Sequence, residues 1–168
     1  RTQLEEIVVT AERREARLQD VPIAVTAFNE RILQSRQINN VVDIMTTIPN
    51  LHASNNIGQG SATTMFIRGV GETESIITID TPVGFYLDDV YIGRQGVNNM
   101  ALFDIDRIEV LRGPQGTLYG RNTSAGAVKV ITKRPAFEPE FRGELSYGRF
   151  NAWSVKGSAN APVSEKIA

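Results

Sequence analysis

Two glycine-rich stretches have residue types suited to binding phosphate. Residues 69–71 begin like a dinucleotide-binding fingerprint, but Glu74 stands where the third glycine belongs. In the second stretch, Gly120 is followed by Arg121 and not by the Lys that a P-loop uses to reach phosphates. Neither motif is complete. The residues alone still leave open an enzyme that holds phosphate with the glycine-rich turn at 113–126.

Residue types that bind metals or attack substrates are sparse. Asp104 and Asp106 begin like a calcium loop, but Ile108 takes the third acidic position. The chain has 1 His, His52, and 0 Cys, which excludes disulfides, cysteine-based zinc sites and a thiol nucleophile. The adjacent carboxylates at 88–89 fit a tight turn better than a catalytic pair. The sequence therefore predicts no enzyme, no metal site and no cofactor.

Composition sets wider bounds on the protein. The 168 residues are 41% hydrophobic, which is enough for one folded core. A net charge of −1 argues against nucleic-acid binding, which needs a basic surplus. No apolar run reaches the length of a transmembrane helix. Residues 1–6 carry no apolar signal-peptide core, so the protein is either cytosolic or has lost its signal.

Short strands and short helices alternate over most of the chain. Asn29 and Asn40 are suited to cap helices, and Pro49 lies beyond the end of the second one. Asp residues tolerate left-handed backbone angles, so 88–89 fits a two-residue hairpin turn. The predicted strands cover 21–28, 64–69, 85–87, 90–92, 108–111 and 128–131, and the predicted helices carry 32–33, 41–45 and 115–119. This order predicts an α+β domain with a mixed core.

After Pro135 the pattern changes to strict alternation of apolar and polar residues. Two amphipathic strands are predicted, with the aromatic residues Tyr147, Phe150 and Trp153 near the turn between them. Their length suits strands of a membrane β-barrel. A soluble hairpin with one buried face is the alternative, although a two-stranded hairpin alone is marginally stable.

A β-prone pentamer stands apart near the N-terminus, with polar sequence on both sides. It consists of Ile7, Val8, Val9, Thr10 and Ala11, and the charged run 12–17 follows it. An edge strand is the ordinary interpretation of such a segment. A mobile segment whose backbone groups are free to pair with a partner is the competing one.

The stretch 107–133, RIEVLRGPQGTLYGRNTSAGAVKVITK, resembles the signature of the plug domain of TonB-dependent outer-membrane receptors. The match spans more than twenty positions and includes fixed glycine, proline and charged residues. This sequence departs from the family pattern in two places. Family members often carry a glycine pair where Ser124–Ala125–Gly126 stands, and the position of Lys129 is frequently Asn.

The resemblance implies a mixed-sheet plug domain with short helices, followed by the first two antiparallel strands of a truncated transmembrane β-barrel. Residues 1–20 would be a periplasmic arm, 21–135 the plug, and 140–168 the barrel strands. The whole would sit in the outer membrane of a Gram-negative bacterium, in contact with its lipid. It would import a ligand such as a ferric siderophore, with TonB as energy-coupling partner and no nucleic acid. A freestanding soluble plug-like binding module is the alternative.

The resemblance also assigns residues to roles. The pentamer at 7–11 resembles the TonB box, the peptide that binds TonB. Arg68 and Arg112 match two arginines that face glutamates on the barrel wall, a role suited to guanidinium groups. The loops at 71–75 and 93–99 correspond to apical loops that meet substrate, and the predicted ligand contacts are Arg94, Gln95, Val97, Asn98 and Asn99.

Overall fold

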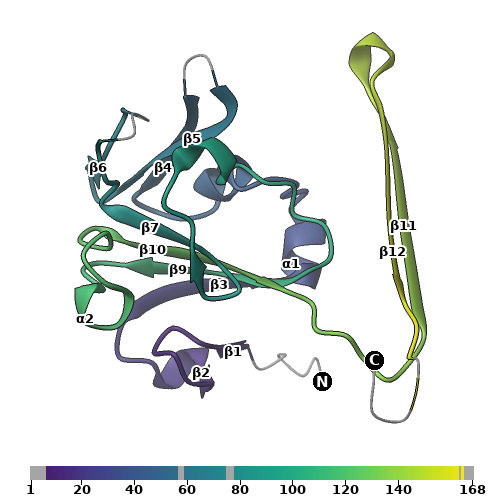
Figure 1. The fold of residues 1–168 in the computed structure, drawn as a ribbon, viewed down its shortest axis with the longest axis horizontal. Coiled ribbons are helices and arrows are strands. Elements are labelled where there is room, and N and C mark those ends of the chain that lie inside the picture. The colour runs from purple at the N-terminus through teal and green to yellow at the C-terminus, as the bar shows by residue number, and fades with distance from the viewer. Residues whose placement is uncertain (1–6, 57–58, 75–77, 163, 165–168) are drawn as a thin grey trace. The chain divides into compact units, whose positions relative to one another are not determined.

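The structure, a computed structural model, describes residues 7–56, 59–74, 78–162 and 164. The first six residues of the predicted periplasmic arm and Ser75 of the first predicted apical loop lie outside this range. The chain divides into two compact units, Arg1–Thr132 and Lys133–Ala168 (Figure 1). The two units are described separately below.

A five-stranded mixed sheet organises the first unit. Its strand order is β3-β9-β10-β7-β8, with β10 and β7 parallel and the other neighbours antiparallel (Figure 1). Strand β10 is buried on both faces from Gly126 to Val130. The bounds of the strands are β3 Ala24–Asn29, β7 Val83–Leu87, β8 Val90–Tyr91, β9 Ile105–Arg112 and β10 Gly126–Thr132.

A three-stranded antiparallel sheet and several short helices complete this unit. The smaller sheet has the order β4-β5-β6, and a separate two-stranded ribbon pairs β1 with β2. The strands are β1 Val8–Val9, β2 Ala16–Arg17, β4 Leu51–Asn56, β5 Gln59–Ile67 and β6 Val70–Gly71. The helices are α1 Glu30–Ser35, α2 Gly116–Tyr119 and the 3-10 turns η1 Leu18–Asp20, η2 Val42–Thr46 and η3 Gln95–Val97.

Polar residues at the predicted ends fix several of these elements. The Asn29 side chain accepts a hydrogen bond from the Ile32 amide at 3.0 Å and caps α1. Asn40 accepts from Asp43 in the same way, but the segment that follows is the 3-10 turn η2 and not an α-helix. Asp88 and Asp89 both have positive φ and join β7 to β8, which confirms the predicted hairpin turn.

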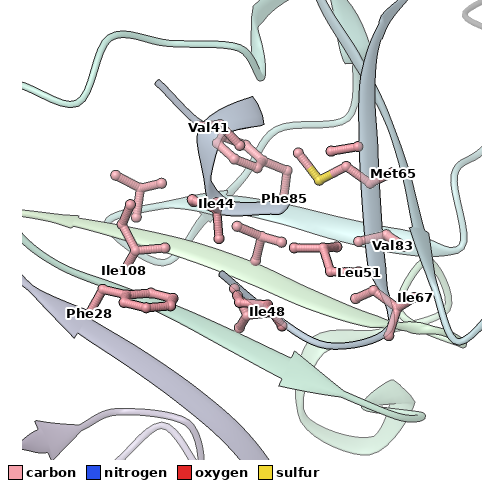
Figure 2. Packing of buried hydrophobic residues seen from close by; sticks show 14 of the residues in the cluster. Phe28, Val41, Ile44, Ile48, Leu51, Met65, Ile67, Val83, Phe85 and Ile108 are labelled. Carbon is pink, nitrogen blue, oxygen red and sulfur yellow. The ribbon is translucent and has the colours of Figure 1, made fainter. Parts of the chain in front are cut away.

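One face of the five-stranded sheet carries a large apolar core (Figure 2). Register places Phe28, Ile108 and Val130 in one row across β3, β9 and β10, while Val110 and Val128 share the next row. Side chains from α1, η2, β4 and β5 cover them, among them Leu33, Ile44, Ile48, Leu51, Met65 and Ile67. The predicted mixed α and β core with short helices is confirmed.

The second unit is a hairpin of β11, Glu140–Tyr147, and β12, Trp153–Asn160, joined through the 3-10 turn η4, Arg149–Asn151. The strands pair antiparallel, with Leu145 opposite Val155 and Tyr147 opposite Trp153. The predicted alternation therefore collects apolar side chains on one face, and they are exposed, Phe141 at 83% and Trp153 at 73%. The two antiparallel strands are as predicted, and their membership of a barrel stays a prediction.

Candidate functional site

The N-terminal pentamer lies against the second face of the five-stranded sheet, opposite the apolar core (Figure 1). Strand β1 pairs antiparallel with β2, with Val8 opposite Arg17 and Val9 opposite Ala16. Val9 and Ala11 are fully buried, whereas Val8 is 42% exposed. The pentamer is therefore a docked strand whose apolar side chains help to close this face of the sheet.

The sheet presents a polar row to the docked pentamer. Ala27, Glu109, Lys129 and Tyr86 are paired in register across β3, β9, β10 and β7. Glu109 and Lys129 are both fully buried, in the middle of two strands whose neighbouring residues are apolar. Because side chains alternate between faces along a strand, these two charges point away from the apolar core.

Thr10 contacts this row through its main chain. Its N–H donates to Oε1 of Glu109 at 2.7 Å. Its carbonyl oxygen accepts from Nζ of Lys129 at 3.0 Å and from the hydroxyl of Tyr119 at 3.2 Å. The Tyr119 hydroxyl also donates to the Ala11 carbonyl at 2.8 Å. Both polar main-chain groups of Thr10 are thus bonded to side chains of the plug.

The Thr10 hydroxyl lies inside the same cluster of charges. It donates to Oε1 of Glu109 at 3.2 Å and accepts from Nζ of Lys129 at 2.9 Å. Nη2 of Arg107 donates to it at 3.3 Å. The side chain of Thr10 therefore bridges an anion and two cations.

Neighbouring charges complete the cluster. Lys129 Nζ lies 2.9 Å from Asp89 Oδ1 and 3.9 Å from Glu109 Oε2, while Arg107 Nε lies 2.8 Å from Glu109 Oε1. Burial opposes the charged form of Arg107, but its hydrogen bonds to Glu109 and Asp106 and the charges of these two carboxylates together outweigh burial and leave the pKa of Arg107 raised. Burial, with the charges of Glu109 and Asp89, raises the pKa of Tyr119 well above that of a free tyrosine. Tyr119 is therefore a neutral hydrogen-bond donor at neutral pH.

The pentamer was predicted to have backbone groups free to pair with a partner, and in the structure several of these groups are already bonded within the chain. The N–H and carbonyl of Thr10 are occupied, and Ile7 accepts at its carbonyl from the Leu18 amide at 3.0 Å. Sequence reasoning also missed Glu109, Lys129 and Tyr119 as contacts of the pentamer. The available signal was a single charged residue flanked by apolar residues in each of two predicted strands.

Arg68 and Arg112 lie at neighbouring ends of strands. Arg68 and Gly69 form the two-residue turn between β5 and β6, both with positive φ. Arg112 ends β9, and an added Cβ at the next residue, Gly113, would lie 3.6 Å from Nη1 of Arg68. Within the described residues neither arginine has a carboxylate partner, and Nε of Arg112 is buried without a hydrogen bond. The two guanidinium groups are thus oriented by the fold but not neutralised by it.

A hollow of about 400 Å³ borders Arg68 on the outside of β4 and β5. Leu51 and Phe66 contribute to its walls, and His52 lies on its rim with its ring centroid 6.5 Å from that of Phe66. Most of the surface that lines the hollow is apolar, and Arg68 is the charged residue at its edge.

The predicted ligand contacts at 93–99 divide into exposed and buried side chains. Arg94 is exposed, whereas Gln95 and Asn98 are both 6% exposed. Asn98 accepts from the Thr63 amide at 2.8 Å and donates to the Thr63 carbonyl at 2.9 Å, so it extends the pairing of β5. Gln95 donates to the Glu72 carbonyl at 3.3 Å and joins the two apical loops.

The last two predicted ligand contacts differ in what the structure describes. Asn99 donates to Oδ1 of Asn55 at 3.1 Å, and the side chain of Val97 lies outside the described part. The amides of Gln95 and Asn98 hold the loop in place, and the contact of these residues with a ligand stays a prediction.

Metal sites and membrane-spanning helices are two further kinds of feature that a plug or receptor could carry. In the part of the chain that is described, no three His, Cys, Asp or Glu side chains gather as a metal site would require. Among the same residues, no helix is both long and apolar enough to cross a bilayer.

Comparison with known proteins gives a consistent family. The family model of the TonB-dependent receptor plug domain matches residues 17–127. The vitamin B12 transporter BtuB of Vibrio vulnificus is 30% identical over 126 residues, which cover 75% of this chain and 20% of that protein. The iron-regulated outer membrane virulence protein of Vibrio cholerae is 29% identical over 141 residues, covering 77% of this chain and 20% of that protein.

Solved structures share the fold. The ferric yersiniabactin uptake receptor FyuA of Yersinia pestis superposes with a TM-score of 0.76 at 24% identity, over 85% of this chain and 22% of the receptor. The pyoverdine receptor FpvA of Pseudomonas aeruginosa gives 0.77 at 20% identity, over 95% of this chain and 23% of the receptor. The chain thus spans about a fifth of the length of these relatives. Because the family model matches most of it, this chain belongs to the TonB-dependent receptor plug domain family.

Proposed function

We propose that this chain is the plug portion of an outer-membrane active transporter, which binds an extracellular ligand and couples its import to TonB. The observation that carries the proposal is the N-terminal pentamer docked as a separate strand on the polar face of the plug sheet. A segment held there by polar contacts can leave without disturbing the apolar core on the opposite face. In this function the plug does no catalysis of its own.

The proposed parts follow the predicted boundaries. Residues 1–20 are the periplasmic arm with the TonB box at 7–11, and 21–135 are the plug. Residues 140–168 are the first two barrel strands. The exposed apolar face of β11 and β12 supports this last assignment, since such a face suits contact with lipid. The protein is one of the outer membrane.

Arg68 and Arg112 are proposed to bind carboxylates of the barrel wall. The Arg68 guanidinium lies beside Gly113, the residue that follows Arg112 at the end of β9, and neither arginine has a carboxylate partner among the described residues. A buried arginine nitrogen without a hydrogen bond costs free energy until a partner reaches it. A carboxylate supplied from outside the plug would meet that need and would seat the plug reversibly.

The ligand is proposed to be a metal chelate of the ferric siderophore class. Solved relatives are named as receptors for pyoverdine and yersiniabactin, while another relative is named as a vitamin B12 transporter. In this chain, Arg94 is the exposed charged residue of the loop at 93–99. A cation there suits the anionic shell of such a chelate.

A freestanding plug-like binding module is the second candidate. The first unit has its own apolar core, which supports it. The reading frame beyond residue 168 separates the two candidates. Further alternating strands there support the transporter, and a stop codon directly after it supports the module.

The coupling role can be tested at Val8, the exposed residue of the docked strand. Val8→Pro removes one N–H and fixes the backbone angle, so it blocks strand addition to a TonB sheet. Val8→Ala keeps the N–H and is the matched control. In the intact receptor, Val8→Pro should abolish uptake of an iron-loaded siderophore that the cells bind, while binding at the cell surface persists. Normal uptake by Val8→Pro, or loss of surface binding, would contradict the proposal.

A further inference from the structure

Thr10 is the point at which the docked pentamer meets the buried charges. Its N–H donates a hydrogen bond to Glu109, and its carbonyl accepts from Lys129 and Tyr119. Its hydroxyl bridges the charges of Glu109 and Lys129. Strand addition to another protein uses the same kind of main-chain groups. While these bonds persist, neither main-chain group of Thr10 can join the sheet of a partner.

The charges depend on the pentamer in return. Three hydrogen bonds converge on Oε1 of Glu109, while its Oε2 is buried without a hydrogen bond. Lys129 makes two of its short contacts to Thr10 and one to Asp89. Buried charges need partners, and water is a good substitute partner. Departure of the pentamer admits water to the polar row, so hydration offsets the contacts that are lost.

On the opposite face, water cannot compensate for the loss of a cover, because Phe28, Ile108 and Val130 form no hydrogen bonds through their side chains. Removing a cover from apolar side chains exposes area at roughly 25 cal/mol per Å² with no compensating hydration. When the pentamer leaves, water can replace its hydrogen bonds to the polar row. The apolar cost is then confined to Val9 and Ala11 and the residues beneath them, and the large core on the opposite face stays covered.

We propose that Glu109 and Lys129 form a latch that holds Thr10 by its main chain and hydroxyl, so that docking on the plug and pairing with a partner exclude each other. The exclusion of the partner rests on the proposed function. The latch itself does not, because it is a property of the contacts within this chain.

The hydroxyl gives a matched pair of variants. Thr10→Val keeps the shape of the side chain but cannot bond to Glu109 or Lys129, whereas Thr10→Ser keeps the hydroxyl. The main-chain bonds of Thr10 remain possible in both. A change seen with Val and not with Ser therefore reports the charged cluster and not packing.

The experiment uses the full chain, which has 0 Cys, so Val9→Cys introduces a single buried thiol next to the latch. The reaction rate of this thiol with a maleimide measures how often the pentamer leaves the sheet. Adding Thr10→Val should raise the rate roughly 10- to 100-fold, as expected for loss of bonds to charged groups. Thr10→Ser should leave the rate near that of the parent. Glu12→Gln, which breaks an exposed pair with Arg14, is the surface control and should leave it unchanged.

A variant of Lys129 tests the same contact from the side of the plug. Lys129→Met should raise the rate as well, and Thr10→Val should then add less than it does alone, because the shortest hydrogen bond of the Thr10 hydroxyl is already gone and only its longer contacts with Glu109 and Arg107 remain. The latch is wrong if Thr10→Val labels at the parental rate, if Thr10→Ser matches Thr10→Val, or if labelling follows only global unfolding in denaturant. Binding of the purified periplasmic domain of TonB to the released Thr10→Val chain is measured separately. Faster labelling without TonB binding upholds the latch and refutes the proposed function.

Discussion

The two faces of the five-stranded sheet are built from alternate residues of the same strands and behave as opposites. On one face Ile108 and Val130 pack beneath helices and a second sheet. On the other, their neighbours Glu109 and Lys129 pair with each other and bind a short docked strand through hydrogen bonds to Thr10. The comparison teaches that alternate residues of the same strands can give one sheet a large apolar core on one face and a row of buried charges under a short docked strand on the other. We propose that this docked strand is removable, whereas the apolar core is permanent.

The first prediction concerns the permanent face and has the largest expected effect. Ile108→Ala leaves a cavity at a fully buried position in the apolar core. It should lower the free energy of unfolding by about 2–5 kcal/mol, measured by denaturant titration. Val90→Ala, in the same row but 63% exposed, is the control and should change little. A loss below about 1 kcal/mol for Ile108→Ala would mean that this face is not the core.

The second prediction concerns the charges of the removable face. Lys129→Met alone leaves the buried carboxylate of Glu109 short of a partner and should cost about 1–3 kcal/mol of unfolding free energy. Adding Glu109→Leu should restore most of that loss, because replacing a buried pair by apolar residues is often neutral. The same denaturant titrations measure both. Additive losses in the double variant would show that the two charges act independently.

The third prediction is the smallest and tests the hydroxyl of Tyr119. Tyr119→Phe removes the donor to the Thr10 and Ala11 carbonyls while the ring keeps its edge contact with Tyr86. Docking of the pentamer should weaken by about 0.5–1.5 kcal/mol, read from thiol labelling of Val9→Cys.

The pH dependence of the same hydroxyl follows from its raised pKa. A raised folded-state pKa means that its contribution is complete below the ordinary tyrosine value, about 10, and is lost as pH rises through the folded value. The gap between wild type and Tyr119→Phe should therefore shrink in alkali. A gap that is constant with pH would point to packing in place of the hydrogen bond.

Local rules in the sequence predicted the elements of the fold well. Asn29 caps α1, and the Asp88–Asp89 turn joins two strands, because each depends on residues only a few positions away. The elements that were missed are short: β4 alternates apolar and polar residues only from Leu51 to Ser54, and β2 and β6 have 2 residues each. The 3-10 turns η1 and η3 were missed as well. The 3-10 form of η2 was also not foreseen, since the cap at Asn40 starts either kind of helix.

Local sequence rules could not predict which residues contact one another in the candidate site. Thr10 and Glu109 are 99 positions apart, and their meeting depends on the register of β9 against β10 and on the path of the N-terminal segment. Alternation in 108–111 showed that Glu109 points away from Ile108, but not what covers it. The sequence also did not show that the loop at 93–99 folds back onto β5 and that Asn98 bonds to the main chain of Thr63 there.

Native-state hydrogen exchange of the Thr10 amide tests the central claim most directly. The account predicts that this amide, bonded to Glu109, exchanges through a local opening that needs less free energy than global unfolding and hardly depends on denaturant. The amides of Val110 and Val128, at the centre of the sheet, should exchange only with global unfolding. If the Thr10 amide shows the same opening free energy and denaturant dependence as Val110, the pentamer is part of the permanent core and the removable cover does not exist.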